Sequence, residues 1–348
     1  MVLFSVGALT AFAAGRLMRI FGEWRLAVFC ALAVACGMLL LSVWGGNAAW
    51  LAVFFFGLAF GPETPVSAAL LTPVTSAGRR PLVFSVRQTG NQIGAIIGSL
   101  SLPWLLTLHP RLPFLSVAVL ACALAFWCAC LSRDPHLAAV RQPVFSGAGS
   151  PSLSLSNWRL GSAQLRLLAI AALLFSATQM SLNVFLLTHA VYDWQLSLAT
   201  AAGWVAWLQV GGLLGRLAWG WLAQRCESAS KLLGVIGLLA ASTGSMLMLL
   251  PLMVGGFLFS VLLFSLGFTA SGWNGVLVAE VSRIAGRQEA GALSGRVLGY
   301  GYIGLALAPG AYAWISEQGT TGLGFLSLFG LTSVAACALV IARPARSG

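Results

Sequence analysis

The sequence predicts an all-α, polytopic membrane protein with about eleven transmembrane helices in two pseudo-repeat bundles. Hydrophobic residues make up 59% of the 348 residues and charged residues only 8%, and the mean hydropathy is +0.92. Soluble domains carry about 25% charged residues, so this chain has too few to cover a surface that faces water. The composition argues against a soluble enzyme, a nucleic-acid binder and a disordered regulator. The other two observations are the spacing of apolar stretches and the placement of basic residues.

Apolar stretches recur along the whole chain, and a membrane-spanning helix needs about 20 mostly apolar residues. The stretches that we expect to span the membrane lie near residues 1–14, 26–44, 48–74, 84–107, 112–132, 165–188, 198–222, 231–251, 255–279, 291–315 and 322–342. The first is short and no positive residue precedes it, so it does not have the basic start of a signal peptide. We expect it to be the second half of a longer helix.

Basic residues lie almost entirely in every second connection between these stretches. Eighteen of the 19 Lys and Arg residues fall in the odd-numbered connections or the C-terminal tail, and only Arg111 falls in an even-numbered one. This count includes Arg216, which we expect still to lie in its helix. Positive residues stay on the cytoplasmic side, so we expect these connections and the C-terminus to be cytoplasmic in a bacterial inner membrane. The net charge of +11 is spread thinly, so no nucleic-acid partner is expected.

A segment rich in Ser, Pro, Gly and Arg interrupts the apolar pattern at residues 133–163. This composition is typical of a flexible linker, which we expect to lie in the cytoplasm. It divides the chain into a five-span N-terminal bundle, residues 1–132, and a six-helix C-terminal bundle with a short tail, residues 164–348.

The two bundles repeat each other at a nearly constant offset. The segment that starts at Gly15 corresponds to a segment at the end of the seventh stretch that starts at Gly220, 205 residues later. Phe56 corresponds to Phe264, 208 residues later. A duplicated helical bundle is typical of secondary transporters. Because the first bundle is shorter by about one span, we expect that the first helix of a twelve-span ancestor is missing.

The connection after the first stretch carries a motif, and its later copy carries part of the same motif. The matching residues are Gly15, Leu17, Gly22 and Arg25 in the first copy, and Gly220, Leu222 and Arg225 in the second. The first copy resembles the loop between the second and third helices of the major facilitator superfamily of transporters, whose pattern is G-x-L-x-D-R-x-G followed by basic residues. Arg19 and Gln224 stand where this pattern has Asp, and Ile20 stands where it has Arg.

Two further segments are similar to members of this superfamily. Arg87 to Gly90, with the glycines that follow, is similar to the fifth helix of the cyanate and nitroimidazole-type permease subgroup. Gly272 to Gly275 is similar to the tenth helix of related members. The resemblance covers the whole chain, and it implies the superfamily fold without its first helix and transport by alternating access.

The resemblance also implies a gate at the cytoplasmic side. Its residues would be Gly15, Arg19, Gly22, Arg25, Gly220, Arg225, Glu280 and Arg283. Glu280 and Arg283 lie three residues apart at the end of one helix, so we expect them to form an ion pair that reaches Arg225. Both copies lack the Asp of the usual charge lock of this gate.

Glu63 is the leading candidate for proton coupling. It lies well inside the third stretch between Pro62 and Pro65, and prolines remove backbone donors and kink a helix. We expect the carboxylate to be buried in apolar surroundings, where its charged form is disfavoured and it can exchange a proton near neutral pH. The alternative is a structural partner for an arginine on a neighbouring helix.

Arg87 and Asn91 are candidates for solute binding on the fourth stretch. They are four residues apart, so they share one helix face, and an arginine can hold an anion through two hydrogen bonds. A cytoplasmic arginine near the helix start is the interpretation that we favour for Arg87. Asn91 is a candidate for a polar pocket.

Four more polar or aromatic residues lie inside apolar helices. Gln179 and Asn183 share one face of the sixth stretch, and the resemblance makes this the cavity-lining seventh helix of the superfamily. Interhelical hydrogen bonds are the alternative for both residues. Trp273 and Asn274 lie between glycines in the ninth stretch, where the indole and the amide could contact the solute.

The repeat, the charge pattern and these polar groups together predict a secondary active transporter of a small organic solute, coupled to protons. Its partners are the solute, protons and the lipid bilayer. We expect no enzyme activity, no cofactor and no metal, because the sequence has no clustered nucleophile and base and no GxxxxGK[ST] loop. The alternative is a non-transporting truncated remnant or a partner-dependent subunit.

Overall fold

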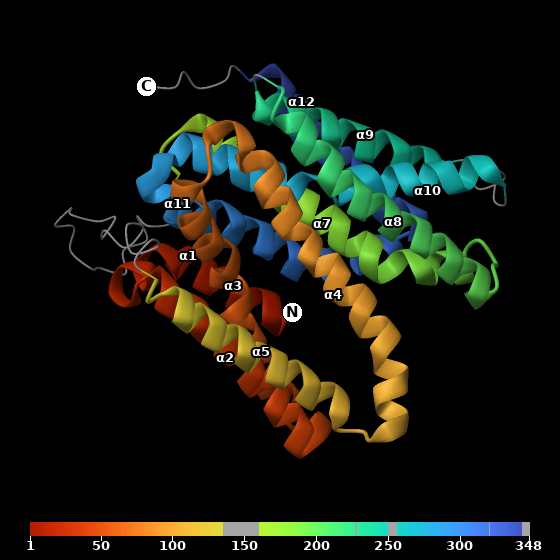
Figure 1. Ribbon diagram of the computed structural model, residues 1–348. Helices are drawn as coiled ribbons and strands as arrows, with labels where there is room; N and C mark the ends of the chain where they lie inside the picture. The colour runs from red at the N-terminus through yellow and green to blue at the C-terminus, as the bar shows by residue number, and fades with distance from the viewer. Residues whose placement is uncertain (135–159, 227, 250–255, 320, 343–348) are drawn as a thin grey trace. The chain divides into compact units, whose positions relative to one another are not determined.

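The computed structural model describes residues 1–134, 160–226, 228–249, 256–319 and 321–342. Within these ranges the regular secondary structure is helical throughout (Figure 1), which confirms the predicted all-α class. Most of the expected linker falls on residues 135–159 and the basic tail on residues 343–348, and these residues lie outside the described part of the chain.

Most helix bounds lie close to the predicted stretches, except in the region of α10 and α11. The first helices are α1 (Val2–Phe21), α2 (Glu23–Trp44), α3 (Ala49–Val74), α4 (Arg80–Leu108) and α5 (Leu112–Leu131), with short 3₁₀ helices η1 (Gly45–Ala48) and η2 (Ala77–Arg79). The later helices are α7 (Ala163–Tyr192), α8 (Leu198–Ala223), α9 (Ala229–Leu249), α10 (Phe257–Ala270), α11 (Trp273–Glu317) and α12 (Thr321–Ile341).

The lengths and apolar composition of these helices are those of an integral membrane protein. In the part of the chain that the structure describes, nine helical stretches are long and apolar enough to cross a membrane. Two of them, Glu23–Val74 and Phe257–Glu317, are 52 and 61 residues long, and a single crossing needs about 20. The count of eleven spans therefore stays a prediction.

One predicted stretch, residues 255–279, is wrong as a single helix. The structure ends α10 at Ala270 and starts α11 at Trp273, with Ser271 and Gly272 between them. The backbone N–H of Ser271 donates to the Gly267 carbonyl oxygen at 3.1 Å, which closes the last turn of α10. The apolar residues continue on both sides of this break, so hydropathy alone does not reveal it.

Local signals place several helix ends. Ser162 and Ser197 cap the starts of α7 and α8, because each side-chain oxygen accepts from a backbone N–H in the first turn, at 3.2 Å in both cases. Gly22 separates α1 from α2 with φ of 81°, a conformation that glycine adopts without steric cost. Gly286 interrupts the 45 residues of α11 in the same way, with φ of 70°.

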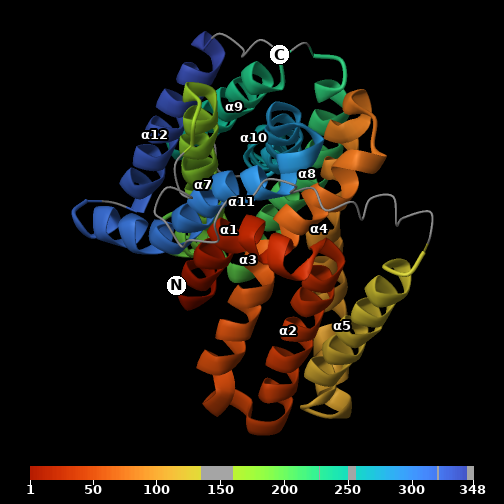
Figure 2. The same cartoon turned by 90° about the vertical axis from the view of Figure 1, so that its left-hand side faces the viewer.

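The described chain gathers into two compact units, each considered by itself. The first contains Met1–Ala77, the described part of Ile93–Leu160, and Val281–Tyr302. Within it α1 packs along α3, and α2 packs against both α3 and α5 (Figure 2). The hydroxyl of Tyr302 donates to the Phe60 carbonyl oxygen at 3.2 Å.

The second unit contains Gly78–Gln92, the described part of Gly161–Glu280, and the described residues from Ile303 onward. In this unit α12 packs against α7 and α9, and α10 packs against α8 and α9. Its core includes Leu186, Leu266 and Phe329, none of which is more than 1% exposed. The proposed division into residues 1–132 and 164–348 stays a prediction.

Candidate functional site

Polar side chains of the second unit gather where α7 faces its neighbours. Gln179 and Asn183 lie on one side of α7, as their spacing predicts. Asn274 Nδ2 donates to Gln179 Oε1 at 3.3 Å, and Gln209 Nε2 donates to Asn183 Oδ1 at 3.3 Å. The interhelical hydrogen bonds that were the alternative for these residues are therefore present. Asn183 is also exposed and Gln179 half-buried, so both amides remain close to a surface.

Arg216 is a charged residue of this region that the sequence analysis did not place among the site candidates. It lies well inside α8 and is only 5% exposed. Its Nε donates to the Ser271 carbonyl oxygen at 3.1 Å, and its Nη1 donates to the Gln88 carbonyl oxygen at 3.2 Å and to Gln92 Oε1 at 2.9 Å. Arg216 was not chosen as a candidate because the sequence analysis counted it with the basic residues of a cytoplasmic connection. Its burial was the signal that the sequence could not supply.

A line of hydrogen bonds runs from Arg216 through two glutamines to Asn183. Gln92 Nε2 donates to Gln209 Oε1 and to the Gln209 carbonyl oxygen, both at 3.3 Å. Gln209 Nε2 then donates to Asn183 as described above. The line joins α4, α8 and α7 inside one unit. Gln92 and Gln209 are half-buried, and neither was among the predicted residues.

The predicted pair on α4, Arg87 and Asn91, directly precedes Gln88 and Gln92 in the sequence. Asn91 is exposed, and its Nδ2 donates to Gln88 Oε1 at 3.2 Å. Gln88 is buried at 7% exposure and accepts from Arg216 through its backbone. Arg87 is half-buried near the start of α4. Gln88 and Gln92 contact Arg216, the first through its backbone carbonyl oxygen and the second through its side chain, and a pocket role of Asn91 stays a prediction.

Trp273 is a core residue rather than an open lining residue. It is 2% exposed and packs edge to face on Phe175, with ring centroids 5.7 Å apart. Its indole Nε1 is buried and makes no hydrogen bond to the described residues. A small cavity within the unit is lined by Trp273, Phe175, Thr178 and Thr332 among others. The neighbouring Asn274 is half-buried and donates to Gln179. Trp273 and Asn274 therefore differ, because the first lies in the core and the second belongs to the group of polar side chains.

Glu63 is exposed, which corrects the expectation that it is buried. The neighbouring residues Pro62, Thr64 and Pro65 are buried, and the Thr64 hydroxyl donates to Glu63 Oε2 at 3.0 Å. The three prolines of α3 leave it one continuous helix. The carboxylate therefore projects from α3 onto a surface of the described chain.

The first copy of the gating motif shows how its glycines are used. Gly15 is packed so closely that an added Cβ would overlap Ala292, and Gly22 forms the positive-φ turn between α1 and α2. Arg19 and Arg25 are exposed.

The second copy is more embedded in its unit. Gly220 packs against Ser85, and the exposed Arg225 lies with its guanidinium carbon 3.6 Å from the centre of the Trp221 ring, a cation–π contact. Glu280 is 1% exposed, and its Oε1 accepts from Ser230 at 2.6 Å and from Gln164 at 3.2 Å. A role of Glu280, Arg283 and Arg225 in a gate stays a prediction.

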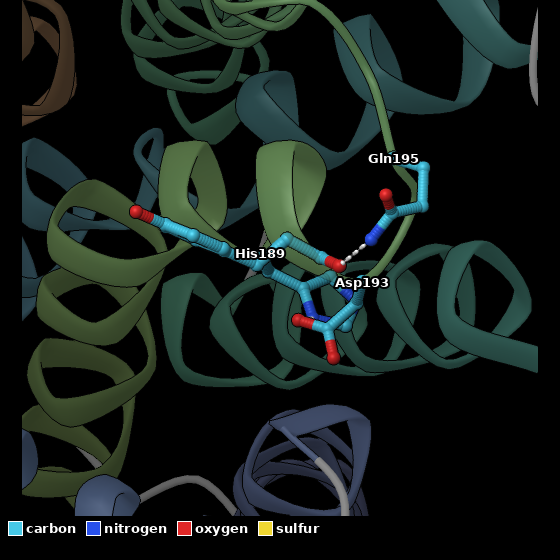
Figure 3. Close-up of polar contacts among 4 residues, drawn as sticks. His189, Asp193 and Gln195 are labelled. Carbon is cyan, nitrogen blue, oxygen red and sulfur yellow. Dashed lines mark hydrogen bonds and ion pairs between the residues drawn. The ribbon is translucent and has the colours of Figure 1, made fainter.

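An acid–base pair fixes the end of α7 (Figure 3). His189 Nδ1 lies 2.9 Å from Asp193 Oδ2, and the His189 ring packs on Phe325 of α12. Gln195 has φ of 56° and donates to the Tyr192 carbonyl oxygen in the loop that follows. Together these contacts hold the end of the helix that carries the polar residues described above. Among the described residues, no three His, Cys, Asp or Glu side chains lie close enough to hold a metal ion.

The sequence was compared with models of known protein families and matches one of them. Residues 1–309 match the Major Facilitator Superfamily. No curated protein sequence matches the chain.

Several solved structures share the fold. The Escherichia coli fucose:proton symporter FucP is similar with a TM-score of 0.73 and 16% identity over 97% of this chain and 89% of that chain. The human organic anion transporter MFSD10 has a TM-score of 0.72 and 16% identity over 97% and 82%. The proton:xylose symporter XylE has a TM-score of 0.69 and 14% identity over 97% and 83%. At these identities the likeness concerns the fold alone.

Proposed function

Because this chain belongs to the Major Facilitator Superfamily and has the fold of its transporters, we propose that it moves a small organic solute across the cytoplasmic membrane by alternating access. The observation that carries the proposal is the group of amide side chains on α7, α8 and α11. Gln179 pairs with Asn274, and Asn183 pairs with Gln209. Polar groups inside membrane helices are costly and mark solute pathways.

The solute site of this proposal is lined by the exposed or half-buried members of that group and by Asn91 on α4. Asn183 and Asn91 are exposed, and Gln179, Gln209 and Asn274 are half-buried. Each amide has two N–H donors and one carbonyl acceptor, so the group suits a polar organic molecule. The similarity of Arg87 to Gly90 to cyanate and nitroimidazole-type permeases concerns the same part of α4 and supports a small solute.

Glu63 is the proton-coupling residue of the proposed transporter. It is the only acidic residue within α3 and lies near the middle of that helix. Its position inside a membrane-length helix supports the role, because ionisable residues within membrane helices mark proton relays. FucP and XylE are proton symporters by name, which supports proton coupling here.

The orientation of the chain completes the proposal. The basic connections, including the gating residues Arg19, Arg25 and Arg225, lie on the cytoplasmic side, and so does the C-terminus. This placement rests on the positive-inside rule.

Reconstituted vesicles test the function. Purified protein in liposomes with a trapped pH-sensitive dye is given an inward proton gradient and a panel of labelled neutral and anionic solutes, from fucose and xylose to succinate and benzoate. We expect at least one solute to accumulate and to acidify the lumen. Absence of uptake above protein-free vesicles across the whole panel would contradict the proposal.

Glu63→Gln tests the coupling. The amide has the same shape and cannot lose a proton, so we expect gradient-driven accumulation to be lost while exchange of labelled for unlabelled solute remains. Glu289→Gln is the matched control, because Glu289 is also exposed but lies on α11, and it should keep both activities. Accumulation by Glu63→Gln equal to that of the wild type would rule out the proposed role.

A further inference from the structure

We propose that Arg216 is the anion-binding residue of this chain, and that the solute carries a carboxylate or another compact anionic group. This inference rests on the proposed transport function and names its substrate class. It starts from the charge of Arg216 and the chemistry of its partners.

The partners of Arg216 are all neutral. Two are backbone carbonyl oxygens, of Ser271 and Gln88, and the third is the side-chain oxygen of Gln92. Among the described residues no carboxylate pairs with this guanidinium. A buried charge is normally paired, because burial removes its hydration. The side chain is 5% exposed, so its charge lacks the counter-ion that burial demands.

The end of α10 supplies only part of the missing negative charge. Ser271 is the C-cap of α10, and its carbonyl oxygen accepts from Arg216 Nε. The C-terminal end of a helix is equivalent to roughly half a negative charge. This contact orients the guanidinium and leaves a net positive charge for a further ligand.

The hydrogen-bonding capacity of Arg216 is also incompletely used. A guanidinium has five N–H donors, and the contacts to the described residues involve only Nε and Nη1. The second terminal nitrogen, Nη2, makes no hydrogen bond to those residues. Two terminal nitrogens in one plane match the two oxygens of a carboxylate.

Gln92 is the partner that an anion would displace. The carbonyl oxygens of Ser271 and Gln88 belong to the backbone of a helix or its cap and cannot move away independently. The Gln92 side chain is half-buried and has rotatable bonds, and its Oε1 lies 2.9 Å from Arg216 Nη1. A carboxylate oxygen in this position would add its own negative charge to a hydrogen bond in which only the guanidinium is charged now, and it would supply the counter-ion that Arg216 lacks among the described residues.

The other end of the hydrogen-bonded line offers a place for the rest of the solute. Asn183 is exposed and uses its Oδ1 to accept from Gln209. Its Nδ2 donates to none of the described residues. An anionic solute with a second polar group could therefore bind the arginine with one end and this amide with the other.

Thermal unfolding of the purified protein in detergent tests the inference. The probes are succinate and benzoate, with succinamide and benzamide as neutral analogues of matched shape. We expect the carboxylates to raise the Tm and the amides to leave it unchanged. Arg216→Gln should weaken the apparent affinity for the carboxylates at least about tenfold, since it removes a charge-assisted pair. Arg166→Gln, at an exposed arginine near the start of α7, should keep the wild-type response.

A second variant keeps the test decisive if Arg216→Gln does not fold. Gln92→Glu places a carboxylate beside Arg216 within the chain, so we expect a higher Tm without ligand and no further rise with succinate or benzoate. A purely structural arginine would also gain stability from this substitution, but the wild type would then show no preference for carboxylates over amides.

Two results overturn the inference without touching the transport function. One is a wild-type Tm response to the amides that equals the response to the carboxylates. The other is uptake of neutral solutes alone by the reconstituted vesicles, with succinate, benzoate and every other anion excluded. Loss of all uptake would contradict the transport proposal itself, so the two failures are distinguishable.

Discussion

One contact between helices of the second unit is a single hydrogen bond between two buried hydroxyl groups. The Oγ1 atoms of Thr178 on α7 and Thr332 on α12 lie 2.8 Å apart. The two residues are 3% and 2% exposed. Such a pair stabilises a membrane bundle only modestly, because the separated helices find other partners. Removing one hydroxyl is more costly than removing both, because the remaining one stays buried without a partner.

Thr178→Val tests this pair. We expect it to lower the free energy of unfolding by about 0.6–1.7 kcal/mol, measured by titration of mixed micelles with a denaturing detergent. The double variant Thr178→Val with Thr332→Val should be closer to the wild type than the sum of the single variants predicts. Strictly additive losses would show that the two hydroxyls do not act as a pair.

Individual residues also mark the limit of what the sequence predicts. The spacing of Gln179 and Asn183 gave their shared face, because helical periodicity is local. Their partners Asn274 and Gln209 come from helices distant in sequence, and no local pattern connects them. The exposure of Glu63 was predicted wrongly, since α3 is apolar on all sides and its sequence does not distinguish a packed face from an open one.

At the level of elements, the contact of α8 with α10 depends on glycine. A Cβ at Gly211 or Gly215 would overlap the carbonyl oxygen of Phe264 or Phe268, and one at Gly267 would overlap that of Leu208. The two backbones therefore approach more closely than any side chain permits, as small residues allow in membrane bundles. This close approach brings Ser271, at the end of α10, within reach of Arg216 on α8.

Gly215→Ala is expected to destabilise the protein by about 1–3 kcal/mol, because the methyl group has no space and the helices must separate. Gly203→Ala on the same helix is the control, since no atom lies within 4 Å of its added Cβ and alanine favours the helix. Unfolding in mixed micelles gives both values. Equal effects of the two substitutions would show that the packing at Gly215 is looser than described.

Hydropathy predicted where helices exist better than where they stop. The predicted stretch at residues 165–188 lies within α7, and the one at residues 198–222 ends one residue before α8 does. Polar or charged residues bound these helices, so the sequence marks their ends. Between α10 and α11 the chain stays apolar, and the break follows from backbone geometry at Ser271 and Gly272.

At the scale of the whole molecule, the side of the membrane on which each connection lies is the property most open to test. We expect green fluorescent protein at the C-terminus to fluoresce, and alkaline phosphatase inserted after Arg111 to be active, because the proposed orientation places the first in the cytoplasm and the second outside it. Alkaline phosphatase inserted after Ser228, between α8 and α9, should be inactive. The reverse pattern of activities would invert the proposed orientation.

The line from Arg216 to Asn183 has a direction as well as a path. Arg216 donates to Gln92, Gln92 donates to Gln209, and Gln209 donates to Asn183, so each amide dipole is aligned with the next. Hydrogen bonds in such a chain polarise one another. The aligned dipoles therefore extend part of the positive potential of the buried Arg216 to the exposed amide of Asn183. An anion would be attracted to this amide before it came into contact with the arginine.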